Sequence, residues 1–211
     1  PVGETFAGKG AIATTSPIQL GACGVCGSSA AVDFMRHADL VLCIGTRLTD
    51  FTTASQSAFQ NPDVRFIGVN VSGQDAHKQG ALPIIADART ALRALHKAAQ
   101  AAGVRPRPTH VRRVEKAYQA YRHQVETKDF HTARGKPLGQ THMLGIVNEA
   151  SRKGAAVIAA SGTLPDIINK MWNTNNGSRA LLEFGFSCMG HEIPAGIGVR
   201  MTQKKGEVYI L

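Results

Sequence analysis

Short apolar runs that alternate with helical stretches constrain the fold of this chain most strongly. Three such runs lie at residues 38–45, 64–71 and 82–86, and each ends near a glycine or a polar turn, as buried strands do. The last run leads into residues 88–102, where leucines recur at helical spacing. Strands that alternate with helices favour a parallel sheet with helices packed on its faces. The sequence therefore predicts an α/β fold built on a parallel sheet.

The same pattern restarts in the second half of the chain. Residues 141–152 predict a helix and residues 155–160 a buried strand, and a further strand is predicted at residues 207–211 after a Gly/Pro turn and another helix. Parallel sheets hold their ligands outside the carboxyl ends of the strands. Because the last strand stops at the end of the sequence without a following loop, we expect the chain to be a fragment of a longer protein.

A basic segment separates the two halves. Residues 93–136 contain eleven Lys and Arg against three Asp and Glu, so this segment accounts for +8 of the net charge of +9. Within it, a proline-rich break at residues 105–108, a polar helix at 109–128 and a turn at 135–137 are typical of a connection between domains. We therefore divide the chain as follows: a first domain at 1–103, a basic helical linker at 104–137 and the start of a second domain at 138–211.

The basic segment makes nucleic-acid binding an alternative, since clustered cations contact phosphate. Its three aromatic residues are Tyr118, Tyr121 and Phe130, and the two tyrosines fall on the apolar face of the predicted helix. We therefore expect no nucleic-acid partner. No apolar run approaches the roughly 20 residues of a membrane helix, and no signal-peptide pattern opens the sequence. We expect a cytoplasmic protein without membrane contact.

Two of the four cysteines form a Cys-x-x-Cys pair, Cys23 and Cys26. Two thiolates at this spacing can hold a metal ion or exchange disulfides. The sequence has no second pair of this kind, Cys43 lies in an apolar strand, and Cys188 is remote. We therefore interpret the pair as small packing residues and expect no metal site in the chain.

Glycines lie at turns where a backbone can approach a phosphate. Gly21, Gly24 and Gly27 precede a helix start at residues 28–31, and residues 8–10 read Gly-Lys-Gly. Such glycines let amides face a phosphate, but they also serve plain tight turns. The spacing differs from the dinucleotide fingerprint, so structural turns are favoured. A non-catalytic nucleotide-binding module remains an alternative.

Two stretches of the second half are candidates for a ligand site. Residues 161–165, Ser-Gly-Thr-Leu-Pro, follow a strand and open a helix, where hydroxyls and backbone amides can cradle a diphosphate. Residues 184–198 form an apolar run that is rich in glycine. This run is compatible with a closely packed helix or with the wall of a cofactor site, and composition does not distinguish the two.

Long stretches of the chain resemble a known enzyme family. Residues 3–10, 38–53 and 64–78 resemble the middle domain of thiamine-diphosphate enzymes of the acetolactate-synthase type. The runs at 75–78 and 184–190 resemble a branch of this family that hydrolyses a cyclic dione. The resemblance covers nearly the whole chain. It implies a Rossmann-like middle domain followed by the start of a domain that binds the diphosphate of the cofactor.

The resemblance implies cofactor-binding roles for seven residues. At the diphosphate these are Ser161, Gly162, Thr163 and Leu164, and at the aminopyrimidine ring they are Ser187, Cys188 and Met189. The thioether of Met189 would wedge between the two rings of a bent cofactor. The alternative is that Met189 is simply a core residue.

The resemblance also implies what the chain lacks. The domain with the activating glutamate and the Gly-Asp-Gly metal motif are both absent, so we expect no catalytic residue and no metal ligand in these 211 residues. The isolated chain should be inactive. The intact enzyme would be a homo-oligomer, a dimer or tetramer, that uses thiamine diphosphate and Mg²⁺ on a small cyclic dione. An acetolactate-synthase-type carboligase is the nearest alternative.

Overall fold

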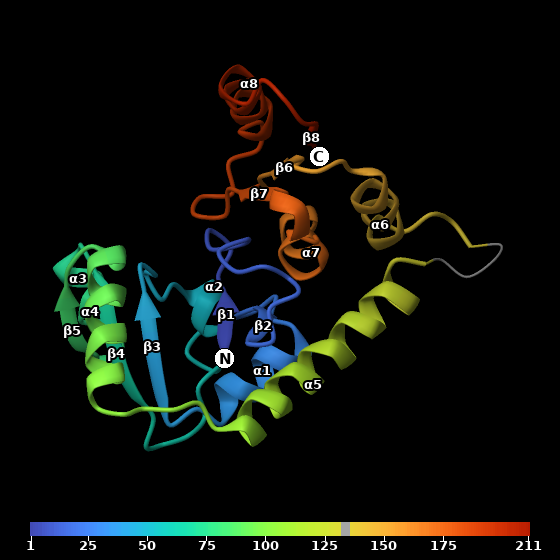
Figure 1. Ribbon diagram of the computed structural model, residues 1–211. Coiled ribbons are helices and arrows are strands. Elements are labelled where there is room, and N and C mark those ends of the chain that lie inside the picture. The colour runs from blue at the N-terminus through green and yellow to red at the C-terminus, as the bar shows by residue number, and fades with distance from the viewer. Residues whose placement is uncertain (132–135) are drawn as a thin grey trace.

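The computed structural model describes residues 1–131 and 136–211 and shows two α/β parts joined by a long helix (Figure 1). The turn predicted at residues 135–137 begins at Gly135, which lies outside the described residues. In chain order, the first part comprises β1 (Val2–Glu4), β2 (Gln19–Ala22), α1 (Ser29–Arg36), β3 (Leu40–Ile44), α2 (Asp50–Thr53), β4 (Arg65–Asn70), α3 (Gly73–Ala76), β5 (Leu82–Ile85) and α4 (Ala88–Ala101). The joining helix is α5 (Pro108–Gln124). The second part comprises α6 (Gln140–Ala150), β6 (Ala156–Ala159), α7 (Leu164–Met171), β7 (Arg179–Leu182), α8 (Glu192–Thr202) and β8 (Val208–Ile210).

Every strand pair within the described residues is parallel, which confirms the predicted α/β class. β1 pairs with β2, and β3, β4 and β5 form a sheet in that order. The runs predicted at 38–45, 64–71 and 82–86 are these three strands, and the helix predicted over 88–102 is α4. The periodic pattern of the sequence therefore located the elements of this sheet.

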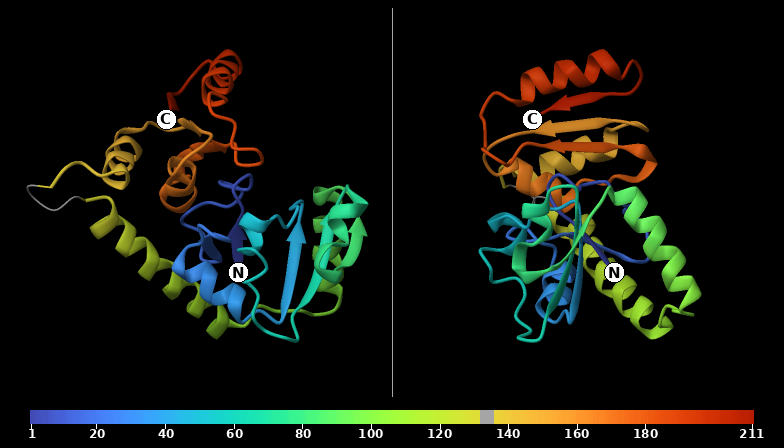
Figure 2. Two further views of the ribbon diagram at one scale, coloured as in Figure 1. Left: turned by 180° about the vertical axis from the view of Figure 1, so that it is seen from behind. Right: turned by 90° about the vertical axis from the view of Figure 1, so that its left-hand side faces the viewer.

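The second part contains a sheet with β6 between β7 and β8. The predicted elements at 141–152, 155–160 and 207–211 are α6, β6 and β8. α8 lies on one side of this sheet and α6 and α7 lie on the other (Figure 2). Because helices cover both faces, all four residues of β6 are fully buried.

Among the strands that follow β1, two, β2 and β7, have no counterpart among the predicted runs. β2 contains a glutamine and a glycine, yet all four of its residues are buried, because α1 and α5 pack on it. The side-chain Oε1 of Gln19 accepts from the backbone N–H groups of Leu20 and Gly21, both at 3.0 Å. The buried glutamine thus satisfies its oxygen within its own strand, so a polar residue is tolerated where an apolar one is expected.

α5 packs its apolar side into the protein. Val114, Tyr118 and Tyr121 are buried, as the predicted apolar face of this helix requires. They belong to one hydrophobic core with members from both parts of the chain: Leu20, Ala30, Ala31, Val114, Tyr118, Tyr121, Val125, Phe130, Leu144, Val157, Ala159, Ile168, Met171 and Trp172. The basic helix therefore contributes to a core shared by the two parts. The domain limits at 103 and 137 stay predictions.

The basic side chains of α5 make two kinds of contact. Arg122 is largely buried and donates to the main-chain oxygen of Met171 at 3.1 Å. Arg113 is exposed, lies 4.9 Å from the centre of the Phe34 ring and pairs with Asp33 at 3.3 Å. Among the helices described, none is both long and apolar enough to cross a membrane.

Candidate functional site

The carboxyl ends of β6 and β7 lie side by side at one edge of the second sheet. The two strands pair in parallel up to Ala159 with Leu182, and the backbone N–H of Glu183 donates to the oxygen of Ala159 at 3.1 Å. Residues 161–164 follow β6, and residues 187–189 follow β7. Parallel sheets hold ligands at this edge. Both predicted cofactor segments therefore leave the sheet at the same place, which we call the carboxyl edge.

Residues 161–164 form the turn from β6 into α7. Gly162 has a φ of +82°, which other residues rarely adopt, and open space lies where its Cβ would stand. The Thr163 hydroxyl donates to Oε1 of Gln140 at 2.6 Å, which ties the turn to α6. Backbone N–H groups in the first turn of a helix attract anions. The exposed turn before α7 therefore suits an anionic group such as a diphosphate.

Ser187, Cys188 and Met189 lie in an exposed loop between β7 and α8. The side chain of Met189 is 86% exposed and that of Phe186 is 89% exposed. Met189 therefore lies outside the hydrophobic core of the described residues. The thioether is free to contact a ligand at the carboxyl edge.

The apolar run at 184–198 divides into a loop and a helix. Its first part is the exposed loop, and α8 begins at Glu192. Inside α8, Gly196 stands so close to the side chain of Ile210 on β8 that an added Cβ would overlap it. The closely packed helix is therefore confirmed for residues 192–198. The cofactor wall stays a prediction for the loop before it.

Glu183 organises this loop, and sequence reasoning did not select it. Its Oε1 accepts from the backbone N–H of Phe186 at 3.0 Å, and its Oε2 accepts from that of Cys188 at 2.9 Å. These hydrogen bonds hold the pKa of the Glu183 carboxyl below its usual range. The available signal was an acidic residue directly after a strand and next to the glycine-rich run.

The first part of the chain reaches the same loop. The ring of Phe6 stacks on that of Phe184, with centroids 4.9 Å apart. In the same loop as Phe6, the hydroxyl of Thr14 lies 3.1 Å from the hydroxyl of Thr174. It also accepts from the backbone N–H of Thr174 at 3.1 Å. Through these contacts, the loop that follows β1 packs against the second part.

The Gly-Lys-Gly loop at residues 8–10 turns its amides inward. The N–H groups of Gly10 and Ile12 donate to Oε1 of Glu4, at 2.9 and 3.2 Å. The ammonium of Lys9 lies 3.9 Å from Oε2 of Glu4, and both side chains are buried. Burial lowers the pKa of Lys9 to about 8, although the Glu4 carboxylate acts in the opposite direction. The loop binds its own carboxylate, which favours the structural interpretation of its glycines.

The glycines before α1 allow close backbone packing. A Cβ on Gly24 would overlap the carbonyl oxygen of Phe51, which accepts from the N–H of Val25 at 2.8 Å. A Cβ on Gly27 would stand 2.8 Å from the oxygen of Gly24. These contacts again favour structural turns over a nucleotide site.

In the Cys-x-x-Cys pair, Cys26 is buried and Cys23 is half-buried, and both are free thiols. Burial raises the pKa of Cys23 and that of Cys26 to about 12 each. The thiolate is the form that binds metals and attacks disulfides, so both thiols are inert at neutral pH. In the described parts of the chain, no three His, Cys, Asp or Glu side chains gather closely enough to hold a metal ion.

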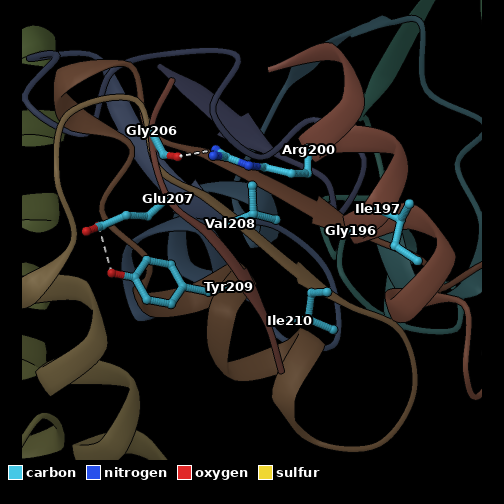
Figure 3. A pocket seen from close by; sticks show the side chains of 8 residues that line it. All are labelled: Gly196, Ile197, Arg200, Gly206, Glu207, Val208, Tyr209 and Ile210. Carbon is cyan, nitrogen blue, oxygen red and sulfur yellow. Dashed lines mark hydrogen bonds between the residues drawn. The ribbon is translucent and has the colours of Figure 1, made fainter. Parts of the chain in front are cut away.

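A hollow lies along the outer edge of β8, beside α8 (Figure 3). Arg200 donates to the main-chain oxygen of Gly206 at 3.0 Å, and the Tyr209 hydroxyl donates to the Glu207 carboxylate at 2.8 Å, so these polar side chains already have partners within the lining of the hollow. None of the seven predicted cofactor residues lines this hollow. We therefore place the candidate site at the carboxyl edge, because both predicted segments follow the strands that end there.

Comparison with known proteins relates the chain to one group of enzymes. Residues 1–95 match the family described as "Thiamine pyrophosphate enzyme, central domain". The chain is 36% identical over 232 aligned residues to "3D-(3,5/4)-trihydroxycyclohexane-1,2-dione hydrolase 2" of Bacillus cereus, and this alignment covers 100% of the chain. It is 34% identical to the Clostridium botulinum enzyme of that name, with 99% of this chain covered. The chain spans 36% of the length of each of these relatives.

Proposed function

We propose that this chain, whose residues 1–95 match the central domain of thiamine pyrophosphate enzymes, is part of a hydrolase that uses thiamine diphosphate. The proposed substrate is 3D-(3,5/4)-trihydroxycyclohexane-1,2-dione, which the similar proteins carry in their names. The proposed reaction cleaves a carbon–carbon bond of the ring with water and yields linear 5-deoxy-glucuronate, a step of myo-inositol degradation.

One observation carries the proposal: the segments at 161–164 and 187–189 leave adjacent parallel strands at the carboxyl edge. A cofactor with an anionic end and an aromatic end requires two kinds of surface close together. The turn before α7 offers hydroxyls and amides, and the loop before α8 offers an exposed thioether. This pairing of an anion-binding turn with an apolar contact supports thiamine diphosphate as the ligand.

In the proposed site, the chain's own residues bind and orient the cofactor. The amides of residues 162–164 and the hydroxyls of Ser161 and Thr163 would donate hydrogen bonds to the diphosphate. Met189 would pack against a ring, and the main chain of Ser187 and Cys188 would meet the aminopyrimidine edge. Thiamine diphosphate supplies a stabilised carbanion for cleaving a bond beside a carbonyl. These residues contribute binding and orientation, and no proton transfer is assigned to them.

Three further features belong to the proposal. Mg²⁺ would bridge the diphosphate to oxygen ligands, and the intact protein would be a cytoplasmic homo-oligomer. The surfaces available for assembly include the exposed apolar residues Ile193, Ile197 and Met201 on α8. Metal analysis and sedimentation of the intact protein test these features directly.

The proposal is tested by product analysis on the intact protein to which these residues belong. We expect the cyclic dione to be converted to a linear acid only when thiamine diphosphate and Mg²⁺ are both present. The Thr163→Val variant should bind the cofactor about three- to ten-fold more weakly, since it loses a hydrogen-bonding hydroxyl. Thr202→Val is the matched control, because the Thr202 hydroxyl bonds only within α8.

The same assay separates the carboligase alternative. A protein that converts pyruvate to acetolactate and leaves the dione intact would contradict the hydrolase proposal. Dione hydrolysis that does not depend on thiamine diphosphate would contradict the cofactor. For the 211-residue chain alone we expect no activity, and tight binding of thiamine diphosphate with magnesium in calorimetry would contradict that expectation.

A further inference from the structure

The loop after β7 holds two large apolar side chains in solvent. Phe186 and Met189 are both almost fully exposed, although burial of such side chains is worth about 2 kcal/mol each. Exposed apolar groups that gather in one place mark a contact surface. The exposure of Phe186 and Met189 therefore depends on the conformation of the loop backbone.

The side chain of Glu183 fixes that backbone at two points, whereas Glu192 accepts from the N–H of Gly190 at the longer distance of 3.4 Å. The carboxylate of Glu183 accepts from the N–H of Phe186 with one oxygen and from the N–H of Cys188 with the other. Between these two donors, Ser187 has a φ of +49°, in the left-handed region that side chains other than glycine disfavour. The two hydrogen bonds thus enclose Ser187, a strained residue two positions before Met189.

Contacts on both sides of the enclosed residue extend this anchor. Before it, Phe184 stacks on Phe6 of the first part. After it, the N–H of His191 donates to the oxygen of Cys188 at 3.2 Å and leads the chain into α8. Glu183 itself follows β7 and bonds back to β6 through its own N–H. A carboxylate at the end of a strand therefore links the rigid sheet to the exposed loop.

We propose that Glu183 is the positioning residue that holds Cys188 and Met189 in the conformation that receives the cofactor ring. The inference rests on the proposed function, and it assigns to this carboxylate the bonds on both sides of Ser187. A carboxylate is suited to this task because both of its oxygens accept hydrogen bonds. Hydrogen bonds to a charged acceptor are also stronger than those between neutral groups. Glutamine in its place offers one acceptor oxygen and one donor nitrogen, so it retains at most one of the two bonds.

The first test observes the loop without any cofactor. With ¹³C-labelled methionine methyl groups in the chain, the Met189 signal should shift or broaden in Glu183→Gln, while the buried Met171 reports that the fold is intact. Glu207→Gln is the matched control, because Glu207 also accepts from a backbone N–H, that of Arg152 at 2.9 Å, in another part of the sheet. A Met189 signal that responds equally to both variants, or to neither, overturns the inference.

The second test measures cofactor binding in the intact protein. Glu183→Gln should weaken the binding of thiamine diphosphate about ten-fold relative to Glu207→Gln, since a loop released from its anchor must be ordered on binding. Wild-type affinity in Glu183→Gln, together with a displaced Met189 signal, overturns the positioning role. Absence of binding in the wild type overturns the proposed function instead, and the methyl spectra then still report whether Glu183 holds the loop.

Discussion

The two three-stranded sheets are built from similar apolar runs but differ in how deeply they are buried. In the sheet of the second part, all residues of β6 are fully buried. In the sheet of the first part, Leu40, Leu42 and Ile44 of β3 are 49%, 44% and 37% exposed. Hydropathy alone does not predict this difference, since the β3 run is at least as apolar as the β6 run.

The helices that cover each sheet explain the difference. β6 has α8 on one side and α6 and α7 on the other (Figure 2). In the first part, α3 packs on the face that contains Gly68, so closely that an added Cβ would overlap the oxygen of Ala76. Residues 40, 42 and 44 share the other face of β3, because successive side chains alternate along a strand. An apolar strand therefore predicts a sheet, whereas its burial depends on elements that lie elsewhere in the chain.

The largest expected effect comes from a pair of variants that test the difference in burial between β6 and β3. Ile158→Ala in β6 should lower the free energy of unfolding by about 2–5 kcal/mol, since it leaves a cavity in a fully buried strand. Leu42→Ala in β3 should cost about 1 kcal/mol or less, because the side chain is already half exposed. Urea unfolding of both variants measures the two losses. Equal losses would show that the faces of β3 and β6 are equally covered.

The second prediction concerns pH at the junction of the two parts. Lys9 is buried, and its pKa in the folded chain is about 8, below its unfolded value of 10.5. Between pH 8 and pH 10.5 the unfolded chain binds more protons at this site, so stability rises with pH. The free energy of unfolding of the wild type relative to Lys9→Met should increase by about 1–3 kcal/mol over this interval. The buried thiols have the opposite influence on the pH dependence of stability, but both proteins contain them, so their influence cancels in the difference. A difference in unfolding free energy that stays flat or falls over this interval would contradict the prediction.

A smaller effect tests whether α5 ties the two parts together. The Tyr121 hydroxyl donates to the main-chain oxygen of Lys170 in α7 at 3.0 Å. Tyr121→Phe should therefore lower stability by about 1 kcal/mol. Tyr118→Phe is the control, because the Tyr118 hydroxyl has no hydrogen bond among the residues that the structure describes. Similar losses in thermal unfolding would argue against a specific tie between α5 and α7.

The smallest effect is expected on the exposed side of the same helix. Arg113 pairs with Asp33 and lies over Phe34, but its side chain is 62% exposed. Exposed ion pairs contribute little, so Arg113→Gln should change the unfolding free energy by about 0.5 kcal/mol or less, with a further decrease of the effect in high salt. A loss as large as that of Tyr121→Phe would mean that the outer contacts of α5 matter as much as its buried ones.

Much of the fold was predictable because periodicity is a local property. The strands β3, β4, β5, β6 and β8 and the helices α4, α5 and α6 follow from apolar runs and helical spacing. β2 was missed since its glutamine satisfies its oxygen within the strand and its burial comes from α1 and α5. β7 was missed because only its residues 180–182 are apolar, which is too short a run to stand out.

The candidate site was predictable in part. The turn at 161–164 carries a local signature of small and hydroxyl-bearing residues between a strand and a helix. The segment at 187–189 was selected only through the resemblance, since an apolar run gives no reason to expect exposure. Glu183 was not selected at all, because its partners are backbone amides, which any sequence provides.

The sequence by itself determined the α/β class, the position of the basic helix and the two segments that could meet a cofactor. Only the tertiary structure decided that β6 and β7 are neighbours and that their following loops share one edge. It also decided that Met189 points into solvent and that Glu183 holds the loop beside it. The reason is physical: helix and strand periodicity is written in neighbouring residues, whereas strand order and burial depend on contacts between residues far apart in the chain.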